Sequence, residues 1–125
     1  MNYYLAIAMG GAAGAMSRYW LHSVIEGFNS SNFPLGTFMV NVAGSVLIGI
    51  FFVVFAEKVH FDAQWRPIVI IGFLGGMTTF SAFSLEGLLL LQQGHYTTAL
   101  FYIFTSVAVC LLAVFTGMQI TRLLL

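Results

Sequence analysis

The residues with the clearest chemical potential lie in one stretch, Gly72 to Glu86, which reads GFLGGMTTFSAFSLE. Gly75 and Gly76 have the loosest backbone, and the two threonines that soon follow lose χ1 freedom in a helix because they are β-branched. Helical propensity therefore drops near Gly75 to Thr79, inside an otherwise apolar segment. In a membrane, a broken helix is tolerated only where its freed N–H and C=O groups face protein, water or an ion. We therefore expect a binding site here.

Two other interpretations of this glycine-rich stretch need weighing. A phosphate-binding loop requires a lysine after its last glycine, and no lysine lies near Gly76. Gly75 and Gly76 are also typical of sites where neighbouring membrane helices approach closely, and that alternative stays open. Phe80 and Phe83 favour a site, because they follow the hydroxyl cluster at a spacing that places both rings on one helical face.

Polar residues repeat at helical spacing in two other segments. The Asn41 amide carries two N–H donors, and two roles are open: a hydrogen bond between helices, or donation to an anion. Taken together, the two sets predict a narrow polar track. They are Thr37, Asn41 and Ser45, and then Tyr102, Ser106 and Cys110.

Two charged residues fall within apolar segments. Glu86 follows Phe83 by three positions, and an acid at membrane depth is a functional candidate that must be neutral or paired. Arg18 is followed by Tyr19 and Trp20, which is typical of a side chain that reaches for the membrane surface. A fixed positive charge there would also attract an anion toward a vestibule, and the two roles are compatible.

The elements that must position these residues are membrane helices. The 125 residues are 60% hydrophobic and 6% charged with no net charge, whereas soluble chains are about one quarter charged. Nothing in this charge balance suggests a nucleic acid partner, and the lipid bilayer is the expected surrounding. We predict an all-α membrane protein in which residues 1–125 form a single four-helix transmembrane domain. The predicted spans are Tyr4 to Val24, Gly36 to Ala56, Pro67 to Leu91 and Ala99 to Leu123.

Packing and orientation signals are unequal in strength. Gly10 and Gly14 have the spacing that lets two membrane helices approach closely. Orientation is weakly specified, because the basic residues are few and most of them, Lys58, Arg66 and Arg122, fall on one side. Four helices of this size also enclose little volume, so a pathway for a solute needs a second copy.

Catalysis has no support in the sequence. Cys110 is the single cysteine, so it forms no disulfide within the chain, and no histidine lies at its depth to activate it. Ser81 has no base nearby in sequence. We therefore do not expect an enzyme.

These elements, in this order and spacing, resemble over essentially the whole chain the small dual-topology fluoride channels called Fluc or CrcB. The matching positions are Gly10, Gly11, Gly14, Arg18 and Tyr19 in the first span, Gly36, Thr37, Val40, Asn41, Gly44 and Gly49 in the second, and Gly72, Gly75, Gly76, Thr78, Thr79, Phe80, Ser81, Phe83, Ser84 and Glu86 in the third.

The resemblance implies an antiparallel homodimer in the inner (plasma) membrane, with two pathways that export cytoplasmic fluoride passively and so give fluoride resistance. It implies a central structural sodium ion held by the backbone carbonyls of Gly75 and Thr78, and a vestibule at Arg18. The implied fluoride pathway comprises Thr37, Asn41, Phe80, Ser81, Phe83, Glu86, Tyr102 and Ser106.

The chain departs from the family pattern at three positions. Ala82 stands where the family usually has threonine, Val46 where an aromatic is common, and Cys110 where serine is frequent. A thiol is a weaker hydrogen-bond partner than a hydroxyl, so we expect the outer end of the track to conduct differently.

A second function remains open. Small multidrug resistance transporters are also four-helix dual-topology dimers, but they exchange protons through a carboxylate in the first helix. Here Glu26 lies past the end of that span, so Glu86 would carry the proton instead.

Overall fold

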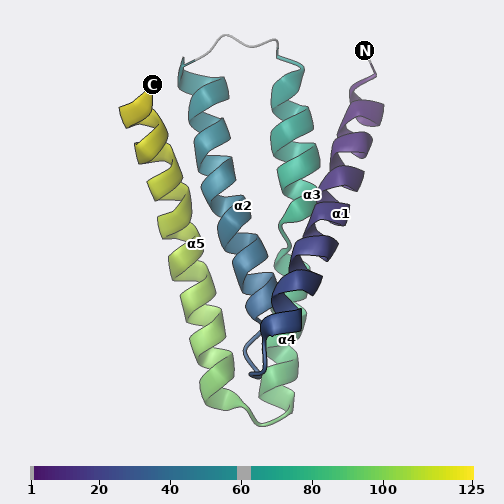
Figure 1. The fold of residues 1–125 in the computed structure, drawn as a ribbon, viewed down its shortest axis with the longest axis vertical. Coiled ribbons are helices and arrows are strands. Elements are labelled where there is room, and N and C mark those ends of the chain that lie inside the picture. Colours follow the sequence, from purple (N-terminus) through teal and green to yellow (C-terminus); the bar gives the residue numbers. More distant parts are fainter. Residues whose placement is uncertain (1, 59–62) are drawn as a thin grey trace.

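The chain forms helices that run along one long axis and reverse at short connections (Figure 1). This computed structural model describes residues 2–58 and 63–125. Both termini lie at the same end of the molecule. The elements are α1 (Tyr3–Phe28), α2 (Leu35–Val53) with its π-helical continuation η1 (Val54–Lys58), the π-helical η2 (Pro67–Leu74), α3 (Gly75–Met77), α4 (Phe80–Gln92) and α5 (Tyr96–Leu124).

Local sequence signals explain where several helices begin and end. The Asn2 side chain accepts a hydrogen bond from the Leu5 N–H at 3.3 Å and caps α1. Pro67 occupies the first turn of η2, where its missing N–H is not needed. After α4, Gly94 adopts a φ of +81°, which turns the chain toward α5 and which other residues rarely adopt.

Three helical segments of the described residues are long and apolar enough to cross a membrane: Leu35–Lys58, Pro67–Gln92 and Tyr96–Leu124. They correspond to the second, third and fourth predicted spans. The remaining helix, α1, has 26 residues and is long enough, but its apolar character is diluted by polar and charged side chains such as Arg18 and Glu26. The first span therefore stays a prediction.

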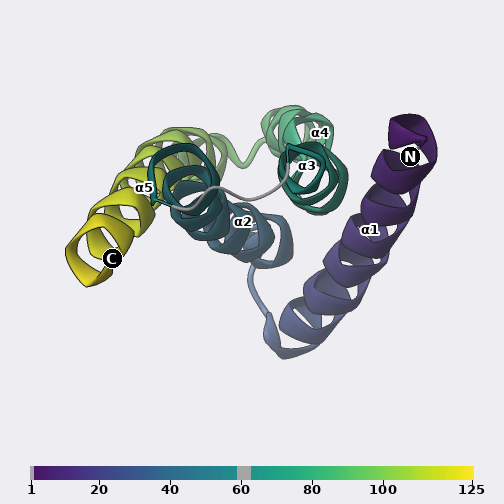
Figure 2. The same cartoon turned by 90° about the horizontal axis from the view of Figure 1, so that it is seen from above.

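Close backbone contact joins α1 to the first half of the broken helix (Figures 1 and 2). A Cβ added at Gly14 would collide with the Phe73 carbonyl oxygen, and one added at Gly76 would lie 2.6 Å from the carbonyl oxygen of Gly11. The predicted close approach is confirmed for α1 and for Gly76. Gly75 differs, because a Cβ there would meet nothing nearer than an oxygen of its own helix at 3.5 Å. Helix packing does not explain Gly75.

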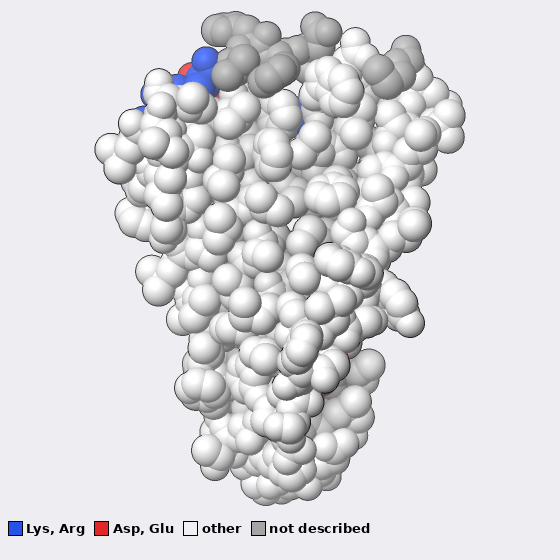
Figure 3. All heavy atoms as spheres, viewed as in Figure 1, with Lys and Arg blue, Asp and Glu red and all other residues white. Residues whose placement is uncertain are grey.

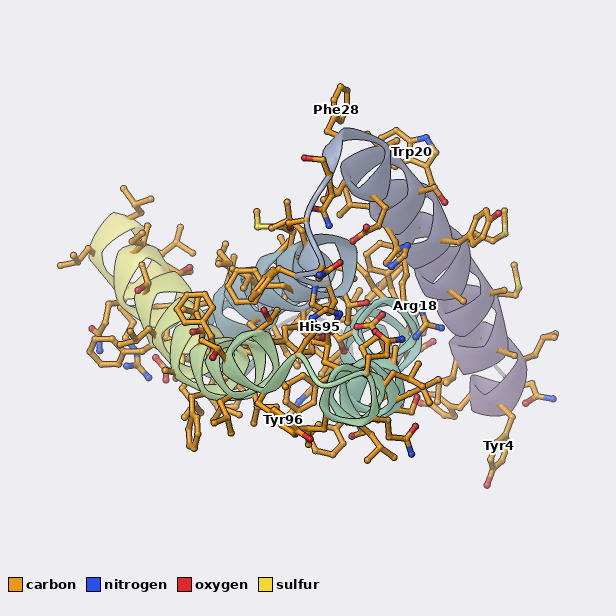
Figure 4. The ribbon with its side chains drawn as sticks, turned by 90° about the horizontal axis from the view of Figure 1, so that it is seen from below. Tyr4, Arg18, Trp20, Phe28, His95 and Tyr96 are labelled. Atoms are coloured by element: carbon orange, nitrogen blue, oxygen red, sulfur yellow. The ribbon has the colours of Figure 1, made fainter. Side chains whose placement is uncertain are left out.

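Apolar side chains cover the outside of the molecule. Figure 3 shows a face with almost no charged atoms except at the end where α5 finishes, and at that end Arg122 forms an ion pair with Glu57 at 2.6 Å. Tyr4, Trp20 and Phe28 point away from the helices (Figure 4) and are 87%, 66% and 88% exposed. This surface suits lipid rather than water.

Candidate functional site

The helix break lies in the middle of the third apolar segment. Thr78 (φ −82°, ψ 156°) and Thr79 (φ −151°, ψ 115°) are extended, and α4 begins at the next residue. The break is confirmed, and it occupies the C-terminal end of the predicted stretch, since Gly75 is still helical. Two adjacent β-branched residues after a glycine pair favour this position for the interruption.

The side chain of Asn41, on α2, holds the broken backbone in place. Its Oδ1 accepts from the Thr79 N–H at 2.8 Å, and its Nδ2 donates to the Thr79 carbonyl at 3.0 Å. The amide thus serves as a link between segments. An amide carries two N–H donors, so one more hydrogen can reach another acceptor.

The break also diverts two N–H donors from their usual partners. In a continuous helix the Thr79 N–H would bond the Gly75 carbonyl, and the Ala82 N–H would bond the Thr78 carbonyl. Here Asn41 takes the first N–H, and the Thr79 hydroxyl takes the second at 3.1 Å. The carbonyls of Gly75 and Thr78 are therefore freed together, and carbonyl oxygens are the ligands that hard cations prefer. These two carbonyl oxygens fit the sodium ion that the sequence resemblance implies.

An open groove runs beside the break. Its aromatic wall is formed by Phe80 and Phe83, whose ring centroids are 5.4 Å apart. Phe83 is buried, whereas Phe80 is 77% exposed. Residues of α2, the break, α4 and α5 line the groove: Asn41, Gly44, Ser45, Ile48, Thr78, Thr79, Phe80, Phe83, Ser106, Val107, Cys110 and Leu111.

One hydroxyl in this groove lacks a partner. Ser106 is only 6% exposed, and its Oγ makes no hydrogen bond within the described residues. Buried polar groups are nearly always satisfied, because leaving one unpaired costs about 1–3 kcal/mol. The wall of the groove therefore contains a polar group whose hydrogen-bonding capacity is unused among the described residues.

Glu86 is held between two hydroxyl groups. Thr37 Oγ1 donates to one carboxylate oxygen at 2.7 Å, and Tyr102 Oη donates to the other at 2.8 Å. The Tyr102 side chain is fully buried, and its ring packs against Phe83 with centroids 5.3 Å apart. Each oxygen of the Glu86 carboxyl group thus has a hydroxyl partner.

A second pocket lies between α1, α2 and α4. It is lined by Arg18 and His22 of α1, Thr37 of α2 and Glu86 of α4. Figure 4 shows Arg18 reaching from α1 toward α4, rather than outward like Trp20. Thr79, at the helix break, lines both this pocket and the groove.

Comparison with known proteins identifies the family of the chain. The family described as "CrcB-like protein, Camphor Resistance (CrcB)" matches residues 5–118. The chain belongs to the CrcB family. The chain is a multi-pass membrane protein and not an enzyme.

Individual CrcB relatives are similar over nearly the whole chain. A "Fluoride-specific ion channel FluC" of Hahella chejuensis is 44% identical over 119 residues, covering 95% of this chain and 94% of the relative. One of Saccharophagus degradans is 41% identical, covering 95% and 89%. One of Methylococcus capsulatus is 43% identical and covers 94% of this chain, but the chain spans only 51% of that relative.

The fold brings most of the predicted site residues together around the helix break. Asn41, Phe80, Phe83 and Ser106 line the groove, and Thr37, Arg18 and Glu86 line the pocket. Tyr102 lines neither and reaches the site through its bond to Glu86.

Ser81 departs from the rest of the predicted set, and Thr79 is a site residue that the sequence did not predict. Ser81 is exposed, lines neither space, and has its hydroxyl 3.2 Å from that of Thr79. Thr79 was not among the predicted site residues, yet it bonds Asn41, caps α4 and lines both spaces. Its place directly before the Phe80 helix is the typical signal of a capping threonine.

Proposed function

We propose that this chain is the subunit of a fluoride-selective channel through which cytoplasmic fluoride leaves the cell down its gradient. One observation carries the proposal. Segments far apart in sequence converge on a groove lined by Ser106, whose buried hydroxyl has no partner among the described residues. That groove belongs to a chain whose relatives are named fluoride-specific ion channels.

The chemistry of the groove suits a small anion. Fluoride is strongly hydrated, so a pathway must replace its water without holding it too tightly to release it. The free N–H of Asn41 and the Ser106 hydroxyl supply donors, and the rings of Phe80 and Phe83 offer positive edges. These contacts are weak individually and spread along the groove, which permits both entry and exit.

A second copy of the chain completes the channel. The groove is open on one side, and Phe80 presents a large apolar side chain there without a covering element. We infer an antiparallel, dual-topology homodimer with two pathways, in which α1 serves as the first of four spans. The position of both termini at one end supports four crossings.

The carbonyl oxygens of Gly75 and Thr78 would bind a sodium ion. Both are available because the N–H groups that would bond them in a continuous helix have other partners at the break. When bound, the ion would supply a fixed positive charge that offsets the two unpaired dipoles. The chain itself keeps these oxygens available: Asn41 and the Thr79 hydroxyl occupy the competing N–H groups. In this proposal the role of sodium is structural.

The pocket beside α1 would serve as the vestibule. Arg18 provides a positive charge that attracts anions, and Glu86 lies across the same pocket, restrained by the hydroxyls of Thr37 and Tyr102. A proton-coupled exporter would instead require Glu86 to bind and release protons during transport. Transport by a proton-coupled exporter would stop when the pH gradient is removed, whereas fluoride flow through a channel would continue.

The first test is efflux from liposomes that contain the purified protein, read with a fluoride electrode and repeated with chloride. We expect rapid loss of fluoride, no loss of chloride, and no dependence on a pH gradient. Phe80→Ile removes a ring edge and should slow fluoride loss. Phe52→Ile should not, because Phe52 lies one turn beyond Ile48 and does not line the groove. Flux that collapses with the pH gradient would support the exporter and contradict the channel.

The second test is thermal unfolding of the purified protein at constant ionic strength while sodium replaces N-methylglucamine. Because a ligand that binds only the folded state stabilises it, the unfolding temperature should rise with sodium concentration. Potassium is the control and should stabilise less, since the larger ion fits the freed carbonyls less well. Equal stability in all three salts would contradict a sodium site.

A further inference from the structure

Gly44 is a buried residue of α2 that lies directly against the helix break. It follows Asn41 by three positions, so the two residues share one face of α2, and both line the groove. A Cβ added at Gly44 would collide with the Cγ2 methyl group of Thr78, and the Thr78 Cβ would lie 3.7 Å away. The methyl group of Thr78 therefore occupies the space that any larger residue in place of Gly44 would need.

The Thr78 side chain is held in one orientation. Its hydroxyl donates to the Leu74 carbonyl at 2.9 Å, and its backbone N–H donates to the same carbonyl at 3.0 Å. A threonine carries its hydroxyl and its methyl group on one carbon, so the bond to Leu74 also fixes the direction of the methyl group. Rotation of the Thr78 side chain away from α2 would break that bond.

A side chain in place of Gly44 would therefore push α2 away from the break. The contact lies one turn from Asn41, whose amide holds the Thr79 backbone through bonds of 2.8 and 3.0 Å. Displacement of α2 would lengthen and weaken both bonds. The Thr79 N–H would then be able to return to the Gly75 carbonyl, its partner in a continuous helix. One of the two carbonyls that are free at the break would be lost.

We propose that Gly44 is a positioning residue of the sodium site: it makes room for the Thr78 methyl group, so that Asn41 can keep the Gly75 carbonyl free. The inference rests on the proposed function, which assigns a structural sodium ion to the carbonyls at the break. It is distinct from helix packing alone. Overpacking lowers the stability of the folded chain at every sodium concentration, whereas loss of a positioned carbonyl reduces the stabilisation that sodium adds.

The experiment measures two quantities for each purified variant. One is the rise in thermal unfolding temperature when sodium replaces N-methylglucamine at constant ionic strength, and the other is fluoride efflux from liposomes. In Gly44→Ala the sodium-dependent rise should be lost, and efflux should fall by about tenfold. A methyl group that only narrowed the groove would slow efflux and leave the sodium-dependent rise intact, and that result overturns the proposal.

A second substitution should relieve the first. Thr78→Ser keeps the backbone carbonyl and the hydroxyl that bonds Leu74, but it lacks the methyl group with which a Cβ at Gly44 collides. The double variant, Gly44→Ala with Thr78→Ser, should therefore respond to sodium more strongly and conduct fluoride faster than Gly44→Ala alone. If Gly44→Ala does not fold, folding of the double variant supports the proposal. A double variant that performs no better than Gly44→Ala overturns it.

Gly49→Ala is the matched control on the same helix. A Cβ at Gly49 would collide with the Val114 carbonyl oxygen of α5 and not with the break, and Gly49 does not line the groove. This variant should unfold at a lower temperature but keep the sodium-dependent rise, and Thr78→Ser should not relieve its effect. Equal loss of the rise in Gly49→Ala and Gly44→Ala overturns the proposal.

The native chain separates failure of this inference from failure of the proposed function. If its unfolding temperature does not rise with sodium, the proposed sodium site fails, and the role of Gly44 fails with it. If it does rise, and Gly44→Ala shows the same rise, the sodium site stands and only the inference about Gly44 is overturned.

Discussion

At the scale of single residues, the site depends on two side chains that form hydrogen bonds with backbone N–H groups at the helix break. Backbone carbonyls nearby are left without their helical partners. Asn41 bonds both the N–H and the C=O of Thr79, and the Thr79 hydroxyl bonds the Ala82 N–H. The carbonyls of Gly75 and Thr78 lose their helical partners as a result. A pair of polar side chains thereby fixes an irregular backbone at membrane depth.

Replacing Asn41 with aspartate tests this arrangement. Asn41→Asp removes the donor to the Thr79 carbonyl and places a negative charge in an anion path. We expect fluoride efflux to slow by at least tenfold, since about 1.4 kcal/mol of added barrier already slows a rate that much. Asn2→Asp is the control, because aspartate caps α1 as asparagine does. Unchanged efflux in Asn41→Asp would remove Asn41 from the pathway.

At the scale of elements, glycines hold the broken helix against α1. The α1 backbone approaches so closely at Gly14 that a Cβ there would meet the Phe73 carbonyl oxygen, and it would also lie 2.9 Å from the Met77 nitrogen. Backbone atoms cannot move aside as a flexible side chain can. The position of α3, and with it the position of the break, therefore depends on small residues in α1.

Gly14→Ala tests this packing. The added methyl group must push the two backbones apart, and overpacking of this kind costs about 1–3 kcal/mol. We expect a lower thermal unfolding temperature in detergent, measured by circular dichroism. Gly27→Ala is the matched control on the same helix, because nothing lies within 4 Å of a Cβ at that position. Equal stability of the two variants would contradict the close approach.

At the scale of the whole molecule, charge is scarce and gathers at one end. Arg122 binds Glu57 through two hydrogen bonds of 2.6 and 2.9 Å, and this exposed pair contributes little to stability. The basic residues near that end are too few to impose a strong orientation on insertion. So weak a bias is compatible with the dual insertion that we propose.

Labelling of an exposed turn tests dual insertion. Gln92→Cys in a Cys110→Ser background places one reactive thiol at the exposed end of α4. A membrane-impermeant maleimide added outside sealed cells should label about half of the chains, because the positive-charge bias is weak. Permeabilised cells give the total. Labelling of nearly all or nearly none of the chains from outside would establish a single orientation and contradict the antiparallel dimer.

The sequence by itself determined the features that depend on neighbours within a turn or two. Apolar segment length predicted three spans that the helices bear out, and the glycine and threonine pairs predicted the break that follows Met77. The spacing of Asn41 and Ser45, and of Ser106 and Cys110, placed each pair on one helical face, and all four residues line the groove.

Only the tertiary structure decided which groups meet. The partner of Asn41 is the backbone of a residue 38 positions away, and Thr37 bonds a carboxylate 49 positions away. These pairings depend on the position and rotation of each helix relative to its neighbours. Close backbone contacts at glycines, such as that of Gly14 with the Phe73 carbonyl, fix that position. The spacing of residues shows which face of a helix they share, but not which helix packs against that face. The contacts of Thr79, and the lack of a partner for the Ser106 hydroxyl among the described residues, therefore emerge only when the helices are assembled.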